Sequence, residues 1–480
     1  MTYNSAGVVD SPDKRRDRTT ARTLVFTSAQ SNTKLHEPFW NALQHYCEAR
    51  GAELHVSRFT YNKGGLAGSG RKAGTAKAED QQEVWFDSRI EPFVSDTSVQ
   101  ITPDLVWCGE LNIIPTRVDP ISGFTTYTRD ASAIIPHVKM RLQSVPTMKH
   151  APTKFVYTTG AVTLRNYIQR AAGQRADFHH VFGAVVVEVD DRGQWWVRQL
   201  NAGPDGSFYD LDAHYTAEGA AEQPHRVQAI THGDLHGYKL DPGIARAVFG
   251  YNGQGGILDK LRPHEQFFHD TVDFMPRNHH NIKDNKFLHS MWRQGRDWVE
   301  GEFAYMGEFL SNHAHRPWCK SFVVVSNHDQ AIETWLSNAD ALKDPPNLRT
   351  WLYLNLTAID SVVFSPFCHL LKKYMTTPVT FLREDDSYRI LGEIEAGLHG
   401  HLGPNGARGN PKNLRTVGKA NTGHTHSAGI IEGIYTAGVY GTLDMGYNKG
   451  LSSWSHSMIV TYPNAKRAIL TIKDGRAWRD

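Results

Sequence analysis

Five short motifs rich in aspartate and histidine follow one another through the second half of the chain. Each comes directly after an apolar run that favours a buried strand, or lies in a loop. In order they are Gly233-Asp234-Leu235-His236, His269-Asp270-Thr271-Val272-Asp273, Ser326-Asn327-His328-Asp329, His399-Gly400-His401 and Gly423-His424-Thr425-His426. Loops that leave the carboxyl ends of strands meet at one edge of an α/β sheet. The pattern therefore predicts an α/β fold whose polar site lies at a sheet edge.

Apolar runs between turn residues indicate the remaining elements. Strands are expected at Thr23–Thr27, Leu54–Phe59, Leu105–Cys108, Lys154–Thr158, Arg226–Thr231, Ser321–Val325 and Tyr388–Leu398. Helices are expected at Phe39–Ala49 and over most of Phe287–Leu310. The runs Phe182–Val189 and Trp195–Leu200 predict a hairpin. Short strands with glycine turns follow from Ala428, and the last hairpin is expected around Lys473-Asp474-Gly475.

Composition shifts predict a three-part chain. Residues 1–21 are polar and without periodicity, which is typical of a disordered tail. The small, polar stretch Thr216–Pro224 favours a boundary there. We therefore expect an N-terminal α/β domain of unknown role at 22–220 and a second domain at 221–480. The segment from Tyr61 to about Ala78 carries Lys63, Arg71, Lys72 and Lys77 and predicts a mobile basic loop.

Charge and composition exclude several classes of protein. The net charge is only +2, so any site for a polyanion must be a local patch. The sequence contains no run of 18 apolar residues, which argues against a membrane-spanning helix, and no apolar stretch follows the basic residues near the N-terminus. The four cysteines are scattered, as in a protein of the reducing cytosol. There are 25 histidines, and sixteen of them lie between His225 and His426.

The residue types of the five motifs suit a pair of divalent metal ions. Two ions about 3.5–4 Å apart clamp the attacking and leaving oxygens of a displacement at phosphorus. Such a pair needs about seven ligands, hard oxygens mixed with imidazoles, and one carboxylate that bridges both ions. Two ligands spaced two residues apart on an extended loop can face one ion, as in Asp234-Leu235-His236 and His424-Thr425-His426.

In these motifs the sequence resembles the calcineurin-like metallophosphoesterases. Roughly residues 225–470 match the motif order of that family, which is D-x-H, G-D-x-x-D, G-N-H-[DE], H and G-H-x-H. The fold that the resemblance implies is an α/β/β/α sandwich. The resemblance implies that one metal is held by Asp234, His236 and His426, that a second is held by Asn327, His399 and His424, and that Asp270 bridges the two. His328 would protonate the leaving oxygen, Asp329 would orient His328, and Asp273 would support the site from behind.

The match departs from the family pattern at two positions. His269 stands where the family has glycine before the bridging aspartate. Its bulkier side chain argues against a close approach of the backbone at this position. Ser326 replaces the glycine before Asn327, which is a milder change. His399 is preferred to His401 as the ligand because it directly follows the expected strand, and His401 then becomes a substrate contact or a loop residue without a role.

Basic residues near the motifs indicate a polyanionic substrate. The segment Gly400–Thr422 joins the fourth and fifth motifs and carries Arg408, Lys412, Arg415 and Lys419 without any acidic residue. The cluster that follows the second motif, with Arg277 and His279, is interpreted either as a phosphate-binding loop or as plain surface residues. The candidate substrate-binding residues are Arg277, His279, His401, Arg408, Lys412 and Arg415.

The resemblance implies a metal-dependent hydrolase, with DNA phosphodiester bonds as the first choice of substrate and a metal-activated hydroxide as the nucleophile. The layout of the whole chain is also similar to bacteriophage early-gene nucleases that degrade host DNA, including the stretch Phe178–Gly183. Mn²⁺ is the preferred ion, with Mg²⁺, Zn²⁺ or Fe as alternatives. The expected location is the cytoplasm, which is the cytoplasm of the host if a phage encodes the protein. The sequence leaves open whether the chain forms a homo-oligomer.

Two other functions remain as alternatives. One is a phosphatase or phosphodiesterase for a small nucleotide, which the near-neutral charge permits. The other is a catalytically silent scaffold of the same fold, against which the intact Asn327-His328-Asp329 argues.

Overall fold

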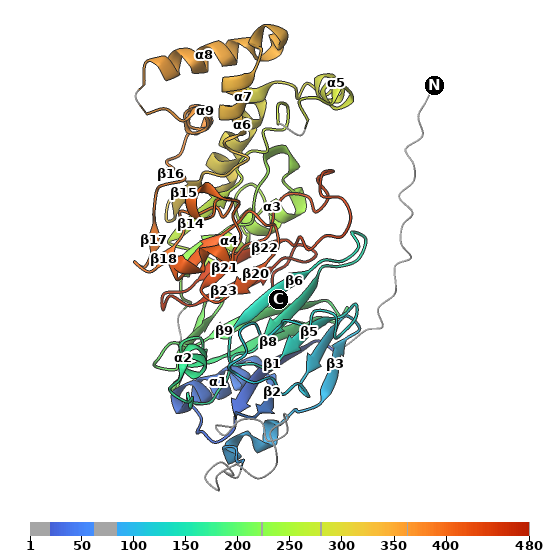
Figure 1. Ribbon diagram of the computed structural model, residues 1–480, viewed down its shortest axis with the longest axis vertical. Coiled ribbons are helices and arrows are strands. Elements are labelled where there is room, and N and C mark those ends of the chain that lie inside the picture. Colours follow the sequence, from blue (N-terminus) through green and yellow to red (C-terminus); the bar gives the residue numbers. More distant parts are fainter. Residues whose placement is uncertain (1–19, 62–83, 222–223, 279–280, 362, 480) are drawn as a thin grey trace, which may run out of the picture.

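The computed structural model describes residues 20–61, 84–221, 224–278, 281–361 and 363–479. Most of the predicted tail at 1–21, nearly all of the predicted basic loop, and His279 lie outside the described residues. The structure is of mixed α/β class, as predicted, and is built around four sheets (Figure 1). No helix in the described ranges is both long and apolar enough to cross a membrane. The four cysteines carry no disulfide.

The N-terminal segment forms a four-stranded sheet in the order β2-β1-β8-β9. Strands β1 (Arg22–Gln30) and β2 (Ala52–Phe59) are parallel and are joined through helix α1 (Glu37–Arg50). The His36 side chain caps the start of α1, and Gly51, with φ of 54°, ends it in the left-handed conformation that glycine favours. Strands β8 (Gly183–Val189) and β9 (Trp195–Asn201) form the predicted hairpin. The sequence predictions for this region are confirmed.

A six-stranded sheet carries the first three motifs. Its order is β16-β15-β14-β13-β22-β23. The four neighbours β13 (Ala229–Thr231), β14 (Glu265–His269), β15 (Lys320–Val324) and β16 (Thr380–Leu382) are parallel, and the hairpin β22 (Ser457–Thr461) and β23 (Arg467–Thr471) completes it.

Helices cover one face of this sheet. They are α3 (Pro242–Phe249), α4 (Ile257–Leu261), α6 (Val299–Phe309), α7 (Ala331–Asn338) and α9 (Pro366–Tyr374). The helices α5 (Asn285–Arg293) and α8 (Leu348–Ile359) lie further from the sheet (Figure 1). Neighbouring residues of one strand face opposite sides. Phe268 and Val323 pack into the core under the helices, whereas Phe267 and Phe322 pack into a second cluster with Ile390 and Ile394. The sheet is therefore buried on both faces.

A ten-stranded sheet joins the two halves of the sequence. Its order is β17-β18-β19-β21-β20-β6-β7-β5-β4-β3. The N-terminal half contributes β3 (Ser98–Thr102), β4 (Leu105–Cys108), β5 (Ser132–Ile135), β6 (Arg141–Val145) and β7 (Lys154–Thr158). The C-terminal half contributes β17 (Arg389–Ile390), β18 (Ile394–Glu395), β19 (Ala420–Thr422), β20 (Gly429–Ile431) and β21 (Ile434–Thr436).

The junction of the halves is the antiparallel pair β20–β6, in which Gly429 lies opposite Gln143 (Figure 1). One hydrophobic cluster beside it combines Val185 and Val187 with Ile430 and Ile459. The predicted division between residues 220 and 221 therefore separates two segments that share a sheet and a core. The smaller elements are α2 (Ala171–Phe178) and a sheet of β10 (Phe208–Asp210), β11 (Ala213–Thr216) and β12 (Gly219–Ala220).

Two predicted elements differ in the structure. The expected strand Tyr388–Leu398 is instead the pair of two-residue strands β17 and β18, because Leu391 and Gly392 adopt positive φ and turn the chain. The helical stretch Phe287–Leu310 is broken into α5 and α6, and Gly295, with φ of 64°, lies in the break.

Candidate metal centre

The five motifs converge where the two larger sheets meet. Asp234 and His236 follow β13, Asp270 follows β14, and His328 follows β15, all in the six-stranded sheet. The other two motifs come from the ten-stranded sheet, since His399 follows β18, and His424 and His426 follow β19. The expectation that the motifs meet at strand ends is confirmed, with both sheets contributing.

Asp270 lies at the centre of the cluster and is fully buried. Its Oδ2 is 3.3 Å from His236 Nε2 and 3.7 Å from His426 Nε2. Its Oδ1 is 3.5 Å from His399 Nε2. The two oxygens of one carboxylate thus face imidazoles on two different sides, so Asp270 could contribute to a metal site on either side.

The first side holds Asp234, His236, Asp270 and His426, whose ligand atoms all lie within 4.8 Å of one another. Asp234 Oδ2 is 3.2 Å from His426 Nε2, and the Nε2 atoms of His236 and His426 are 2.8 Å apart. At this distance the lone pairs of two imidazole nitrogens would repel each other unless a proton or a metal ion lies between them. The predicted first ligand set is therefore brought together.

The second side holds His399 and a residue that was not expected to be a ligand. His269 Nδ1 lies 3.3 Å from His399 Nδ1, and His269, His399 and Asp234 form a second compact group. The ring centres of His424 and His399 are 5.3 Å apart, so His424 lies beside this group. Asn327 is exposed to solvent on the loop after β15. Of the predicted second set, the structure gathers His399 and His424.

Several polar atoms of the cluster are buried without a hydrogen bond to any described residue. They are Asp234 Oδ1, both carboxylate oxygens of Asp270, Nε2 of His269 and of His399, and Nδ1 of His426. A buried polar atom without a partner is costly, and such atoms are rare in folded proteins. Carboxylate oxygens and imidazole nitrogens are ligands of divalent ions such as Mn²⁺ and Zn²⁺. The residues present therefore fit a divalent metal site.

Four candidate ligands have a strained backbone. His236, Asp270, His424 and His426 have φ of 60°, 44°, 72° and 56°, in the left-handed region that non-glycine residues rarely adopt. Such strain is concentrated at active sites, where the surrounding structure holds it in place. The observation is independent of any family resemblance.

The carboxylates of the cluster share a buried environment. Burial and the neighbouring Asp270 raise the pKa of Asp234 to about 6. Burial would also raise the pKa of Asp270, but the surrounding His399, His328 and His236 lower it well below its ordinary value. The site thus favours a cation between the two carboxylates.

His328 is held by Asp273 rather than by Asp329. His328 Nδ1 is 3.1 Å from Asp273 Oδ1, which is also 3.2 Å from His236 Nδ1. Burial alone would lower the pKa of His328, but the nearby carboxylates of Asp270 and Asp273 raise it to about 9. The Asp329 carboxylate instead accepts hydrogen bonds from the backbone N–H groups of Val272 and Ser326. Asp273 makes the orienting contact that was expected of Asp329.

The predicted substrate residues differ in their distance from the metal centre and in whether they are already paired. Arg277 forms a two-pronged ion pair with Asp344, at 2.5 and 2.7 Å, which occupies its guanidinium. His401 lies beside the centre, its ring 5.4 Å from that of His399, and both of its nitrogens are buried without a hydrogen bond to a described residue. Arg408, Lys412 and Arg415 are exposed on the loop that leads to His424.

Sequence reasoning missed His269 as a possible ligand and Lys239 as a support. Lys239 Nζ lies 2.7 Å from Asp273 Oδ2 and so anchors the carboxylate that holds His236 and His328. Glu302 supports the same loop, because it accepts hydrogen bonds from the backbone N–H groups of Asp273 and Met275. His269 stands next to Asp270 in the sequence, and this neighbourhood was the signal that could have identified it as a possible ligand.

The chain is similar to a known phage protein. It is 37% identical to "Protein A1" of Escherichia phage T5 over 486 aligned residues, which cover 98% of this chain and 85% of the phage protein. No protein-family model matches the chain.

Proposed function

We propose a two-metal phosphoesterase activity on DNA for this chain, which belongs to the family of phage T5 protein A1. The observation that carries the proposal is the position of Asp270, whose two oxygens face His236 and His426 on one side and His399 on the other. In this proposal the two facing sheets and their helices form the α/β/β/α sandwich of the calcineurin-like metallophosphoesterases, and the protein acts in the cytoplasm of an infected host.

The ligands fall into two groups joined by Asp270. Asp234, His236 and His426 would hold one ion, and His399, His424 and His269 would hold the other. When bound, two divalent ions would neutralise charge that develops on the phosphate and lower the pKa of a coordinated water. The mixture of oxygen and nitrogen ligands suits Mn²⁺.

The remaining polar residues position the reacting groups. Asp273 contacts Nδ1 of His236 and Nδ1 of His328, so it fixes the orientation of both rings. With Nδ1 of His328 engaged, Nε2 is the nitrogen left to donate a proton to the leaving oxygen. The buried Asp329 holds the loop that carries His328, through its hydrogen bonds to the backbone of Val272 and Ser326.

The basic segment Gly400–Thr422, between the fourth and fifth motifs, supports a nucleic-acid substrate. Arg408, Lys412 and Arg415 are exposed there, and the segment contains no acidic residue. Lysine and arginine near a phosphoester site favour a polyanion over a small neutral ester.

A digestion panel tests the proposal. Linear, circular, single-stranded and double-stranded DNA are each incubated with the full chain in Mn²⁺, Mg²⁺ or EDTA, beside a nitrophenyl phosphodiester. We expect cleavage of DNA and of the small ester in Mn²⁺ and none in EDTA. Cleavage of the small ester alone would favour a small-nucleotide phosphodiesterase. No cleavage of either substrate in any metal would refute the enzyme and leave the scaffold function.

A further inference from the structure

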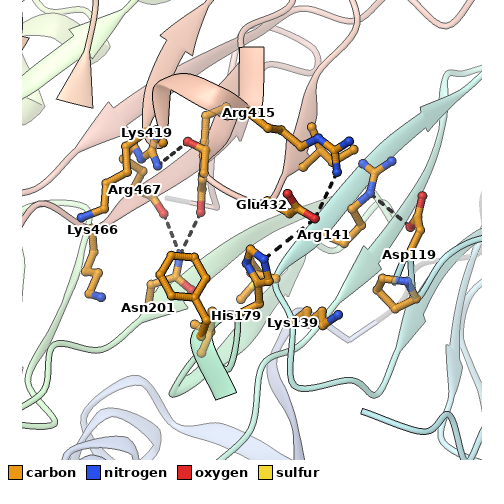
Figure 2. Close-up of a pocket in the computed structure, with 18 of the residues that line it drawn as sticks. Asp119, Lys139, Arg141, His179, Asn201, Arg415, Lys419, Glu432, Lys466 and Arg467 are labelled. Carbon is orange, nitrogen blue, oxygen red and sulfur yellow. Dashed lines mark hydrogen bonds and ion pairs between the residues drawn. The ribbon is translucent and has the colours of Figure 1, made fainter. Parts of the chain in front are cut away.

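A cavity of about 700 Å³ lies between the two halves of the chain, apart from the candidate metal ligands (Figure 2). The N-terminal half contributes residues at the start of β6, the end of α2 and the end of β9. The C-terminal half contributes residues of the basic segment Gly400–Thr422, the turn between β20 and β21, and the start of β23. The volume is that of a ligand site.

The walls of this cavity, called here the basic pocket, are strongly cationic. Seven lysine and arginine side chains line it, against the two carboxylates of Asp119 and Glu432. Figure 2 shows Glu432 between Arg415 and His179, and Arg141 beside Asp119. Lys412 and Lys466 make no ion pair with any residue in the described ranges. Lys419 is paired with Glu393, which does not line the cavity. The remaining lysines and arginines still outnumber the two carboxylates of the pocket.

Burial makes this excess charge costly without a ligand. Burial lowers the pKa of Lys139 to about 8, and the nearby Arg175 adds to the effect. Burial also lowers the pKa of Lys466, and the positive charge of Lys419 acts in the same direction. An anion in the pocket would offset both effects, because an opposite charge favours the protonated form of each lysine.

An aromatic side chain stands at the same wall. Phe178, the last residue of α2, is 82% exposed although it lines the cavity. A phenylalanine this exposed offers a face on which a nucleobase can stack, while neighbouring cations bind the phosphates. The combination of cations and an open aromatic ring fits a nucleotide better than it fits an inorganic anion.

A smaller cavity of about 160 Å³ adjoins the basic pocket. It shares Arg141, Lys412 and Ile431 with the basic pocket, and it is also lined by Thr425. Thr425 lies between the candidate ligands His424 and His426 in the fifth motif. The two cavities are thus neighbours, and the smaller one reaches the loop that carries His424 and His426.

We propose that the basic pocket binds a segment of single-stranded DNA beside the bond that is cleaved. Lys412 and Lys466 contact its phosphates, Phe178 stacks on a base, and the smaller cavity leads the strand toward His424 and His426. The link to cleavage rests on the proposed function, whereas binding in the pocket does not require the metal ions.

The test measures binding without metal. Fluorescence anisotropy of a labelled oligothymidylate of about eight nucleotides, in EDTA, reports the affinity of the full chain over a range of salt concentrations. We expect Phe178→Ala to weaken binding about tenfold. We expect Lys412→Ala with Lys466→Ala to reduce the slope of log affinity against log salt by about 0.7 for each phosphate that the two lysines neutralise.

Matched variants control for charge and folding. Lys34 and Lys343 are exposed outside the pocket, so Lys34→Ala with Lys343→Ala removes the same charge and should leave the salt slope unchanged. Thermal unfolding of each variant checks that it folds, and Phe178 and Lys412 are exposed enough to be replaced without opening the core. If the pocket variants bind the oligomer as the parent chain does, the proposal is refuted.

Two further arms separate the alternatives. Thymidine monophosphate that competes as tightly as the oligomer would show a pocket for free nucleotides and overturn the strand proposal. Hydrolysis of the nitrophenyl phosphodiester by the unaltered chain in Mn²⁺ reports on the metal centre alone. Binding in EDTA without such hydrolysis would refute the phosphoesterase while the pocket stands, and hydrolysis with unchanged binding in the pocket variants would refute the pocket alone.

Discussion

At the level of single residues, the strained backbone of the candidate ligands marks the site most clearly. His236, Asp270, His424 and His426 all have positive φ, and each such residue costs on the order of 1–3 kcal/mol. Their concentration around one buried carboxylate is explained by the need to direct several ligands at the same small volume.

His269 is the residue at which this chain departs most from the pattern it resembles. It is fully buried, its Nδ1 lies 3.3 Å from His399 Nδ1, and its Nε2 has no hydrogen bond to a described residue. We predict that His269→Ala lowers the affinity for one of two ions by about 10–100-fold and leaves the other ion bound. Calorimetric titration with Mn²⁺ measures both affinities.

His232 provides the control for that variant. It is equally buried on the same sheet, but its nitrogens contact Tyr440 Oη and Gln266 Oε1. His232→Asn should lower the unfolding temperature and keep both ions. If His269→Ala binds both ions as tightly as the parent chain, His269 is not a ligand.

His328 is predicted to act on the substrate and not on the metals. His328→Ala should keep the full metal content and lose turnover on DNA by about 10²–10⁴-fold, because a general acid is missing. Part of the rate should return on a nitrophenyl ester, whose leaving group needs no proton. Loss of a metal ion from this variant, or an unchanged rate on DNA, would contradict the assignment.

The sequence predicts residue types better than it predicts their partners. Asp234, His236, Asp270 and His426 meet as expected because each follows a strand end directly. The partner of His328 could not be inferred, because Asp273 reaches it from the loop after a different strand. Arg277 resembles a phosphate ligand in the sequence, but its carboxylate partner, Asp344, lies 67 residues further along the chain.

At the level of elements, a buried ion-pair network supports the N-terminal sheet. Arg198 on β9 lies between Glu188 on β8 and Asp210 on β10, and all three side chains are buried. Burial would raise the pKa of Glu188, but Arg198 lowers it to about 2. Both carboxylates contact the one buried guanidinium of Arg198.

We predict that Arg198→Ala destabilises the protein by about 3–5 kcal/mol, because two buried carboxyl groups lose the buried cation that lies between them. Urea unfolding, followed by circular dichroism, measures the loss. Arg50 also pairs with Glu188 but is 35% exposed, so Arg50→Ala should cost far less. Equal costs for the two variants would show that burial of the network does not determine its contribution.

Single strands were predictable, but the sheets that they form were not. β4, β7 and β15 were expected within one residue of their observed bounds, because each is a short apolar run. The pairing of β6 with β20 joins residues almost 290 positions apart, as in the hydrogen bond from Arg141 to the Ile430 carbonyl. Periodicity within a strand carries no information on such a distant neighbour.

At the level of the whole molecule, the shared ten-stranded sheet makes the two halves depend on each other. Removing residues 1–220 would leave β20 without its partner β6 and would expose Ile430 and Ile459 of the shared core. We predict that the fragment 221–480 aggregates or unfolds without cooperativity, whereas the full chain unfolds as one unit.

Urea unfolding of both proteins, with gel filtration, checks this prediction. A monomeric fragment that unfolds cooperatively and binds two metal ions would contradict it, and would show that the predicted boundary at 220/221 separates autonomous domains.

The metal content of the full chain and of Asp270→Ala tests the central claim most directly. Without Asp270, two cations would lie close together with no fixed negative charge between them, so their repulsion is not compensated. Elemental analysis after loading with Mn²⁺ should approach two ions per chain for the parent protein. We predict at most one ion for Asp270→Ala, with loss of DNA cleavage. A parent chain that binds only traces of any divalent ion, or an Asp270→Ala variant that keeps two ions, would contradict the account.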